Sequence, residues 1–282
     1  MAIRTIFRMA EDCARGERLG WQEFVRDYAG IARALLTHYF STLVREMDQH
    51  VVAVFCRAGS SGATWFGGLK FTNEREFMMA FRGLVLAYGR EQERLPAPEI
   101  TLDHVRAVMK DLTLLEREML WLMIKGYDAP RIAAIMMNAA ATAEAVKRIA
   151  DERLAPQRAN TERAGDPARA ALLLTAPPEA LTASARVLME LAEQLRTDQC
   201  PSLRTFNNLV NGQIAWRERE AAEQHMSNCS YCIDRFTSFQ EMVRLRKDVN
   251  EMPAPQVEAI LAQFPFLAGK PRGVLSRLLA GR

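Results

Sequence analysis

The sequence predicts an all-α protein. Apolar residues recur at intervals of three and four along most of the chain, and the strict alternation of a half-buried strand is scarce. Capping sequences such as Thr113-x-x-Glu116 and turn residues such as Asn211-Gly212 divide this pattern into short helices. Hydrophobic residues make up 49% of the 282 residues, which is enough apolar material for the cores of about two or three domains. We expect two small helical domains, the second with a helix-turn-helix, followed by a metal-stapled helical hairpin.

Residues 1–95 are predicted to form the first helical domain. A helix is expected over 21–40, with apolar residues on one face: Phe24, Tyr28, Ile31, Leu35 and Tyr39. A second helix is expected over 43–55 and a third over 73–90, while the glycine- and serine-rich segment 59–68 is predicted to be a loop. Leu95-Pro-Ala-Pro98 then marks a linker.

Residues 96–154 are predicted to form the second domain, because their helix signals are short and closely spaced. Thr113 and Glu116 make a capping box for a helix that ends near Gly126. Asp128 can cap the next helix, and Thr142 a last helix that runs to Leu154. Short helices joined by turns of a few residues are typical of a helix-turn-helix, although another small helical bundle fits the same spacing.

The remainder of the chain divides into three parts. Residues 155–181 are rich in Ala, Arg and Pro and are predicted to be a linker. Residues 182–250 contain two longer predicted helices, one over 182–196 and one over 235–250, on either side of a cysteine-rich segment. Residues 251–282 are mixed apolar and basic, and this C-terminal tail is expected to dock on the body of the protein or on a partner.

Four potential metal ligands stand in the cysteine-rich segment: Cys200, His225, Cys229 and Cys232. His225, Cys229 and Cys232 are spaced by four and three, so one continuous helix would present all three on one side. With Cys200 arriving from an earlier segment, three thiolates and an imidazole make a closed tetrahedral zinc site. Two alternatives are chance clustering and a Cys229–Cys232 redox pair, but the strand–helix context of thioredoxin is missing.

Composition limits the classes of function. The net charge of +3 permits contact with nucleic acid without arguing for it. No run of 18 apolar residues occurs, so we expect no membrane span, and five unevenly spaced cysteines suggest a reducing cytoplasm. A Gly-rich phosphate loop, a carboxylate pair and a Ser-His arrangement are missing, so an enzyme is not expected.

Three stretches of the sequence resemble motifs of one kind of protein and occur in the same order as those motifs. The first comprises 24–40, the segment Asp48-Gln49 to Arg57, and the segment Asn73 to Arg82; the second comprises 112–133; the third is the Cys/His cluster with its Glu223-x-His225. With these parts the chain resembles a bacterial sigma factor of the extracytoplasmic-function type, fused to a zinc-binding anti-sigma-like domain. The three stretches stand where that family has sigma region two, sigma region four and the anti-sigma zinc ligands.

The resemblance implies a transcription initiation factor that binds RNA polymerase core and promoter DNA. It also implies a zinc domain that contacts the sigma-like domains within the same chain and regulates them, with thiolate oxidation as a potential trigger. Basic candidates for contact with DNA are Arg82, Arg90, Arg131, Lys147 and Arg148.

The charge of the second domain motivates a different interpretation. From Asp103 to Leu154 eight Lys/Arg stand against eight Asp/Glu, a net charge of zero, whereas a helix that reads DNA needs basic residues around it to neutralise phosphates. An adaptor that holds a protein partner and does not read DNA is therefore the alternative.

Overall fold

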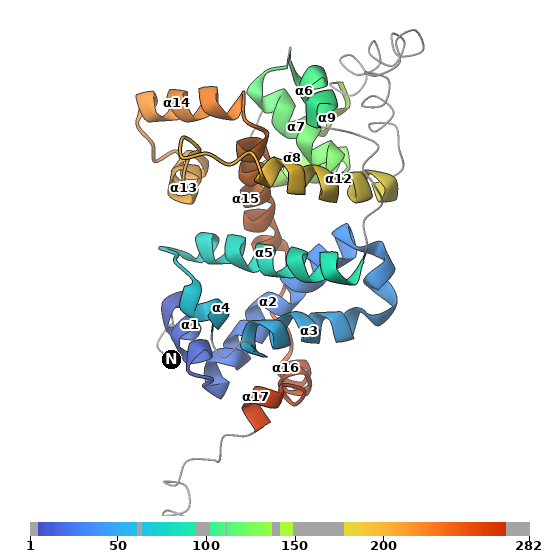
Figure 1. Ribbon diagram of the computed structural model, residues 1–282, viewed down its shortest axis with the longest axis vertical. Coiled ribbons are helices and arrows are strands. Elements are labelled where there is room, and N and C mark those ends of the chain that lie inside the picture. The colour runs from blue at the N-terminus through green and yellow to red at the C-terminus, as the bar shows by residue number, and fades with distance from the viewer. Residues whose placement is uncertain are drawn as a thin grey trace, which may run out of the picture. The chain divides into compact units, whose positions relative to one another are not determined.

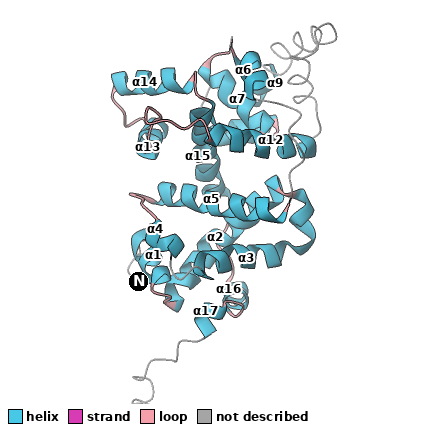
Figure 2. Ribbon diagram, viewed as in Figure 1, coloured by secondary structure: helices cyan, strands magenta, loops and turns pink. Residues whose placement is uncertain are grey.

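A computed structural model describes residues 5–60, 64–93, 102–110, 112–136, 142–148 and 178–268. Within these ranges the regular elements are helices and no strand occurs (Figure 2), so the predicted all-α class is confirmed. None of the described helices combines the length and the apolar character needed to cross a membrane.

The chain divides into two compact units. One consists of Met1–Thr37, Thr42–Gly89 and Asp248–Arg282, and the other of His38–Ser41 and Arg90–Lys247. The first unit therefore combines segments from both ends of the chain. The predicted linker 155–181 lies largely outside the described residues, and the predicted domain boundaries stay predictions.

The first unit is built mainly on three long helices (Figure 1). These are α2 (Arg18–Tyr39), α3 (Met47–Ser60) and α5 (Glu74–Gln92). Shorter elements complete it: α1 (Ile6–Ala14), η1 (Ser41–Glu46), α4 (Thr64–Gly68), α16 (Ala254–Leu261) and α17 (Pro265–Ala268). Helix α5 begins where the sequence predicts, because Asn73 Oδ1 accepts a hydrogen bond from the backbone N–H of Glu76.

Aromatic side chains fill the core of this unit. The ring of Phe24 lies 4.8 Å from that of Phe55 and 5.3 Å from that of Phe81, centroid to centroid, both at steep angles. The predicted loop over 59–68 is wrong in part, because α3 continues to Ser60 and α4 occupies Thr64–Gly68. Phe66 of α4 is buried against this aromatic core, so the gain from burying apolar surface outweighs the low helix propensity of the glycines.

The C-terminal tail docks on the first unit through α16 and α17. The ring of Trp21 on α2 lies 5.6 Å from that of Phe264 and 4.8 Å from that of Phe266. A Cβ at Gly59 would lie 2.2 Å from the Phe266 ring, so only glycine allows this approach. The backbone N–H of Met252 also donates to the carbonyl of Arg26, at 2.9 Å. Residues 269–282 lie outside the described residues.

The second unit contains the predicted helix-turn-helix segment and the cysteine-rich segment. Its described helices are α6 (Leu102–Met109), α7 (Leu114–Ile124), α8 (Ala129–Met136), α9 (Ala143–Arg148), α12 (Pro178–Glu193), α13 (Leu203–Asn211), α14 (Trp216–Met226) and α15 (Ser230–Asp248). The predicted capping box of Thr113 and Glu116 is present, and Asp128 and Thr142 cap α8 and α9. The predicted continuation of the last helix to Leu154 falls outside the described residues.

Two apolar clusters form the core of the second unit. One joins α7, α8 and α9 through residues such as Leu122, Ile132 and Val146. The other joins α6, α7 and α12 with Ile233 of α15. Helix α7 therefore contributes to both clusters, with Leu120 and Trp121 on one side and Met119 and Leu122 on the other.

A buried polar seam connects α7 to α15. Lys125, whose side chain is fully buried, lies 2.9 Å from the Asp234 carboxylate. Its ammonium also donates to the hydroxyls of Thr237 and Ser238, each at 2.9 Å. The indole N–H of Trp121 donates to the same Asp234 carboxylate at 2.9 Å. Since each of these groups is desolvated, the seam fixes the two helices in one register.

Candidate metal centre

The four predicted metal ligands lie together in the second unit. One potential ligand atom from each of Cys200, His225, Cys229 and Cys232 falls within 4.8 Å of all the others. The Sγ atoms of Cys200 and Cys229 are 4.0 Å apart, far beyond the roughly 2.05 Å of a disulfide bond. Thiolates bound tetrahedrally at about 2.3 Å from zinc stand about 3.8 Å apart, so this spacing suits a shared metal ion.

Three short segments bring the ligands together. Cys200 follows α12 in a turn that its N–H closes onto the Thr197 carbonyl, and its Sγ accepts a hydrogen bond from the Thr197 N–H at 3.3 Å. Helix α13 then starts at its N-cap Ser202 and ends at Gly212, whose positive φ of 67° fits the predicted Asn-Gly turn. Helix α14 returns the chain to the cluster.

The predicted single helix carrying His225, Cys229 and Cys232 is wrong. Helix α14 ends at Met226, and α15 begins only at Ser230. The break is stabilised by the Ser227 hydroxyl, which donates to the Glu223 carbonyl, and by the Asn228 side chain, which donates to the Gln224 carbonyl. His225 thus comes from the last turn of α14, Cys229 from the turn between the helices and Cys232 from the start of α15.

The pKa values of the thiols depend on how closely the ligands are grouped. Burial raises the pKa of Cys200, but hydrogen bonds from Thr197 and contacts with His225 and Cys232 outweigh it and lower that pKa to about 7. Burial raises the pKa of Cys232, and its thiol neighbours Cys200 and Cys229 raise it further. The neighbouring thiol groups therefore disfavour ionisation of Cys232, and a bound cation would favour the thiolate form that binds metals.

A buried ring nitrogen completes the fit. Nε2 of His225 is buried without a hydrogen-bond partner among the described residues. A buried polar atom without a hydrogen-bond or metal partner destabilises the folded protein, and a metal ion would provide that partner. The four residues could therefore hold a metal ion, with three sulfur atoms and one nitrogen as donors.

The five candidate DNA-contact residues are distributed over the two units. Arg82 belongs to the first unit, where its side chain is buried. Arg90 in the second unit pairs with Glu190 at 3.1 Å. Arg131 lies in the first turn of α8, while Lys147 and Arg148 are exposed in the last turn of α9. Lys147 and Arg148 are the exposed pair of this set, adjacent on one short helix.

Sequence reasoning missed the buried polar groups around α7 and α15. From sequence, Lys125 is expected to be an exposed basic residue at a helix C-terminus, and Asp234 is expected to lie on a solvent-exposed helix face. Glu118 and Gln240, whose side chains meet at 3.4 Å, also read as surface positions although both are buried. The available signal was the position of Lys125 directly after the apolar run 119–124.

Comparison with protein-family models, with curated proteins and with solved structures gave no match to the chain. What the protein does is therefore inferred from its own residues and their geometry.

Proposed function

We propose that the chain is a sigma-like regulator of transcription initiation, which binds RNA polymerase core and promoter DNA and is restrained by a zinc-binding segment of the same chain. The observation that carries the proposal is the buried seam between α7, in the predicted region-four-like segment, and α15, which starts at the metal cluster. The order of the sequence motifs supports the sigma-like part. Thiol ligands kept reduced suit a protein of the cytoplasm.

Zinc is the metal that we propose for the cluster. Three cysteine thiolates and one histidine form a closed tetrahedral donor set that zinc favours, with no position left for water or substrate. The metal would therefore have a structural role. The turn Ser227–Cys229 and the turn before Cys200 are short, and neither α13 nor α14 buries more than a few apolar residues. Metal binding would add the stability that these helices lack.

The restraint would act through the face of α7 that α15 covers. Besides the Lys125–Asp234 pair, Arg106 of α6 donates to the Ser230 hydroxyl at 3.3 Å, and Arg117 donates to the Ser227 carbonyl. Both acceptors flank the metal ligand Cys229. Loss of the metal would loosen the turn that holds these contacts, and the helices α6 and α7 would become available to a partner.

An adaptor that binds a protein partner without reading DNA is the second candidate. The net charge of zero over 103–154 favours it, because promoter binding depends on phosphate neutralisation. The burial of Arg82 and the pairing of Arg90 favour it as well. Lys147 and Arg148 on α9 are the residues that favour direct contact with DNA.

Competition for RNA polymerase core tests the proposal. The full-length protein is added to core polymerase bound to a labelled housekeeping sigma factor, before and after removal of zinc by a chelator. Release of the label, stronger after zinc removal, supports the proposal, and no release in either state refutes it. A footprint on genomic promoter fragments at moderate salt then separates the two candidates, because an adaptor protects no specific site.

A further inference from the structure

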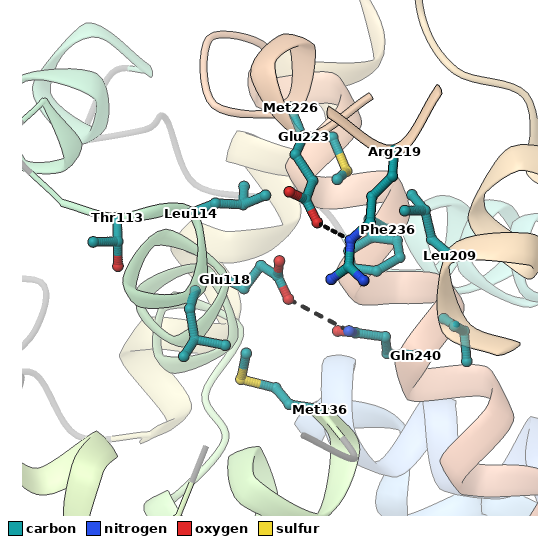
Figure 3. Close-up of a pocket in the computed structure, with 12 residues that line it drawn as sticks. Thr113, Leu114, Glu118, Met136, Leu209, Arg219, Glu223, Met226, Phe236 and Gln240 are labelled. Atoms are coloured by element: carbon teal, nitrogen blue, oxygen red, sulfur yellow. Dashed lines mark hydrogen bonds and ion pairs between the residues drawn. The ribbon is translucent and has the colours of Figure 1, made fainter. Parts of the chain in front are cut away.

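A cavity of about 600 Å³ lies within the second unit, between helices of the predicted helix-turn-helix segment and helices of the metal-binding hairpin. Its walls come from α7, α8, α13, α14 and α15 (Figure 3). Apolar side chains supply part of the lining, among them Leu114, Met136, Leu209, Met226 and Phe236, although polar atoms make up more of its accessible surface. Small-molecule sites are typically concave, largely apolar and of this size.

Two buried polar side chains face this cavity from opposite helices. Glu118 on α7 is 6% exposed and Gln240 on α15 is 5% exposed. The Gln240 amide N–H donates to Glu118 Oε2 at 3.4 Å, a long hydrogen bond. The amide oxygen Oε1 of Gln240 is buried and has no hydrogen-bond partner among the described residues. The cavity is therefore lined by a side chain with an unsatisfied acceptor beside a carboxyl group, among both polar and apolar neighbours.

The charged groups of the lining favour a cation over an anion. They are Glu118, Glu223 and Arg219, and the last two form an ion pair at 2.8 Å. Figure 3 shows the polar ends of Glu118, Glu223, Arg219 and Gln240 turned toward one another. Arg219 is thus already neutralised by Glu223, and its side chain is about half exposed. The remaining ionisable group of the lining is the Glu118 carboxyl group, which can carry a negative charge opposite a bound cation.

The protonation of Glu118 is consistent with a missing partner. Burial raises the pKa of Glu118 to about 8, against a smaller opposing effect of the Gln240 hydrogen bond. A carboxyl group in this environment is costly to ionise unless a cation or several donors stand beside it. A bound ammonium group would donate to Gln240 Oε1 and pair with the Glu118 carboxylate, which satisfies both.

We propose that this cavity is a binding site for a small organic amine with an apolar, aromatic body, held by Glu118 and Gln240. The ammonium group binds between these two side chains. The aromatic body packs against Phe236 and the methionines Met136 and Met226, whose flexible, polarisable side chains adapt to aromatic ligands. The site does not depend on the sigma-like function, because it follows from the cavity and its buried polar groups alone.

Titration calorimetry on the zinc-loaded full-length protein tests this site with three probes of the same shape. They are 2-phenylethylamine, which is cationic, 2-phenylethanol, which is neutral, and phenylacetate, which is anionic. At about pH 8 the amine is expected to bind at least about tenfold more tightly than either of the others. Equal affinity for the three probes, or no binding of the amine, overturns the proposal.

Variants locate the binding. Glu118→Gln keeps the shape of the side chain and removes its charge, and should weaken amine binding at least about tenfold. Gln240→Met keeps the volume and removes the acceptor, and should also weaken it, by about fivefold or more. Glu220→Gln makes the same charge change on the exposed face of α14 and should change the affinity less than about twofold. Unchanged affinity in both cavity variants places the amine elsewhere and refutes the site.

Discussion

Replacing Asp234 by Asn tests the buried seam that joins α7 to α15. The substitution keeps an oxygen that can accept the Trp121 indole N–H, now at 2.9 Å, but removes the negative charge 2.9 Å from the Lys125 ammonium. Lys125 is fully buried, so in this variant its positive charge is desolvated and no longer balanced by the Asp234 carboxylate. Breaking a buried ion pair in this way costs about 3–5 kcal/mol. Because Lys125 keeps its hydrogen bonds to Thr237 and Ser238, we expect the free energy of unfolding to fall by about 3 kcal/mol, the lower end of this range.

Urea denaturation followed by far-ultraviolet circular dichroism measures this loss. The Arg106–Asp103 pair is a matched control, since its atoms are 3.0 Å apart but the Asp103 side chain is 86% exposed. Asp103→Asn should therefore cost less than about 0.5 kcal/mol. The double variant Lys125→Met/Asp234→Asn should be at least about 1 kcal/mol more stable than Asp234→Asn alone, because it no longer buries an ammonium charge without a carboxylate beside it. A cost for Asp234→Asn no larger than that of Asp103→Asn would refute the reasoning.

Three further predictions follow from other parts of the structure. Burial raises the pKa of folded Glu118 to about 8, so the folded protein binds this proton more tightly than the unfolded chain does. The free energy of unfolding should therefore fall as the pH rises from about 5 to 8, by at most about 5 kcal/mol. Urea titrations at several pH values should show a smaller fall for Glu118→Gln. Chelation of zinc should speed hydrogen exchange in α13 and α14 and leave that of α2 unchanged, and equal protection with and without metal would argue against a metal role. Phe264→Ala opens a cavity beside Trp21 of α2 and should lower the free energy of unfolding, measured with urea, by about 3 kcal/mol. Leu19→Ala, at an exposed position of α2, should lower it by less than about 1 kcal/mol.

The helices could be predicted from sequence because their signals are local. The capping box at Thr113 and Glu116 and the Asn211-Gly212 turn act within a few residues, and the structure has both. Segment 64–68 was missed because its glycines suggested a loop, while its stability comes from aromatic residues distant in sequence, with Phe66 against Trp21. Non-local packing of this kind leaves no periodic pattern in a segment of five residues.

The metal cluster was predictable as a set of residues but not in its geometry. Ligand types and spacing were sufficient to select Cys200, His225, Cys229 and Cys232, and the structure brings them together. Their placement on one helix was wrong, since the break at 227–229 depends on side-chain to backbone hydrogen bonds that spacing does not reveal. Lys125 was not predictable as a buried residue, because its partner Asp234 is more than a hundred residues away in the chain.

The affinity of the full-length protein for RNA polymerase core, measured for the wild type and for Asp234→Asn, tests the restraint within the chain most directly. This substitution leaves all four proposed zinc ligands in place and weakens only the contact between α7 and α15. With about 3 kcal/mol less holding the helices together, the variant should bind core polymerase at least about tenfold more tightly than the wild type and the Asp103→Asn control. Equal affinity for the three proteins would contradict the restraint, and no binding by any of them would contradict the sigma-like function itself.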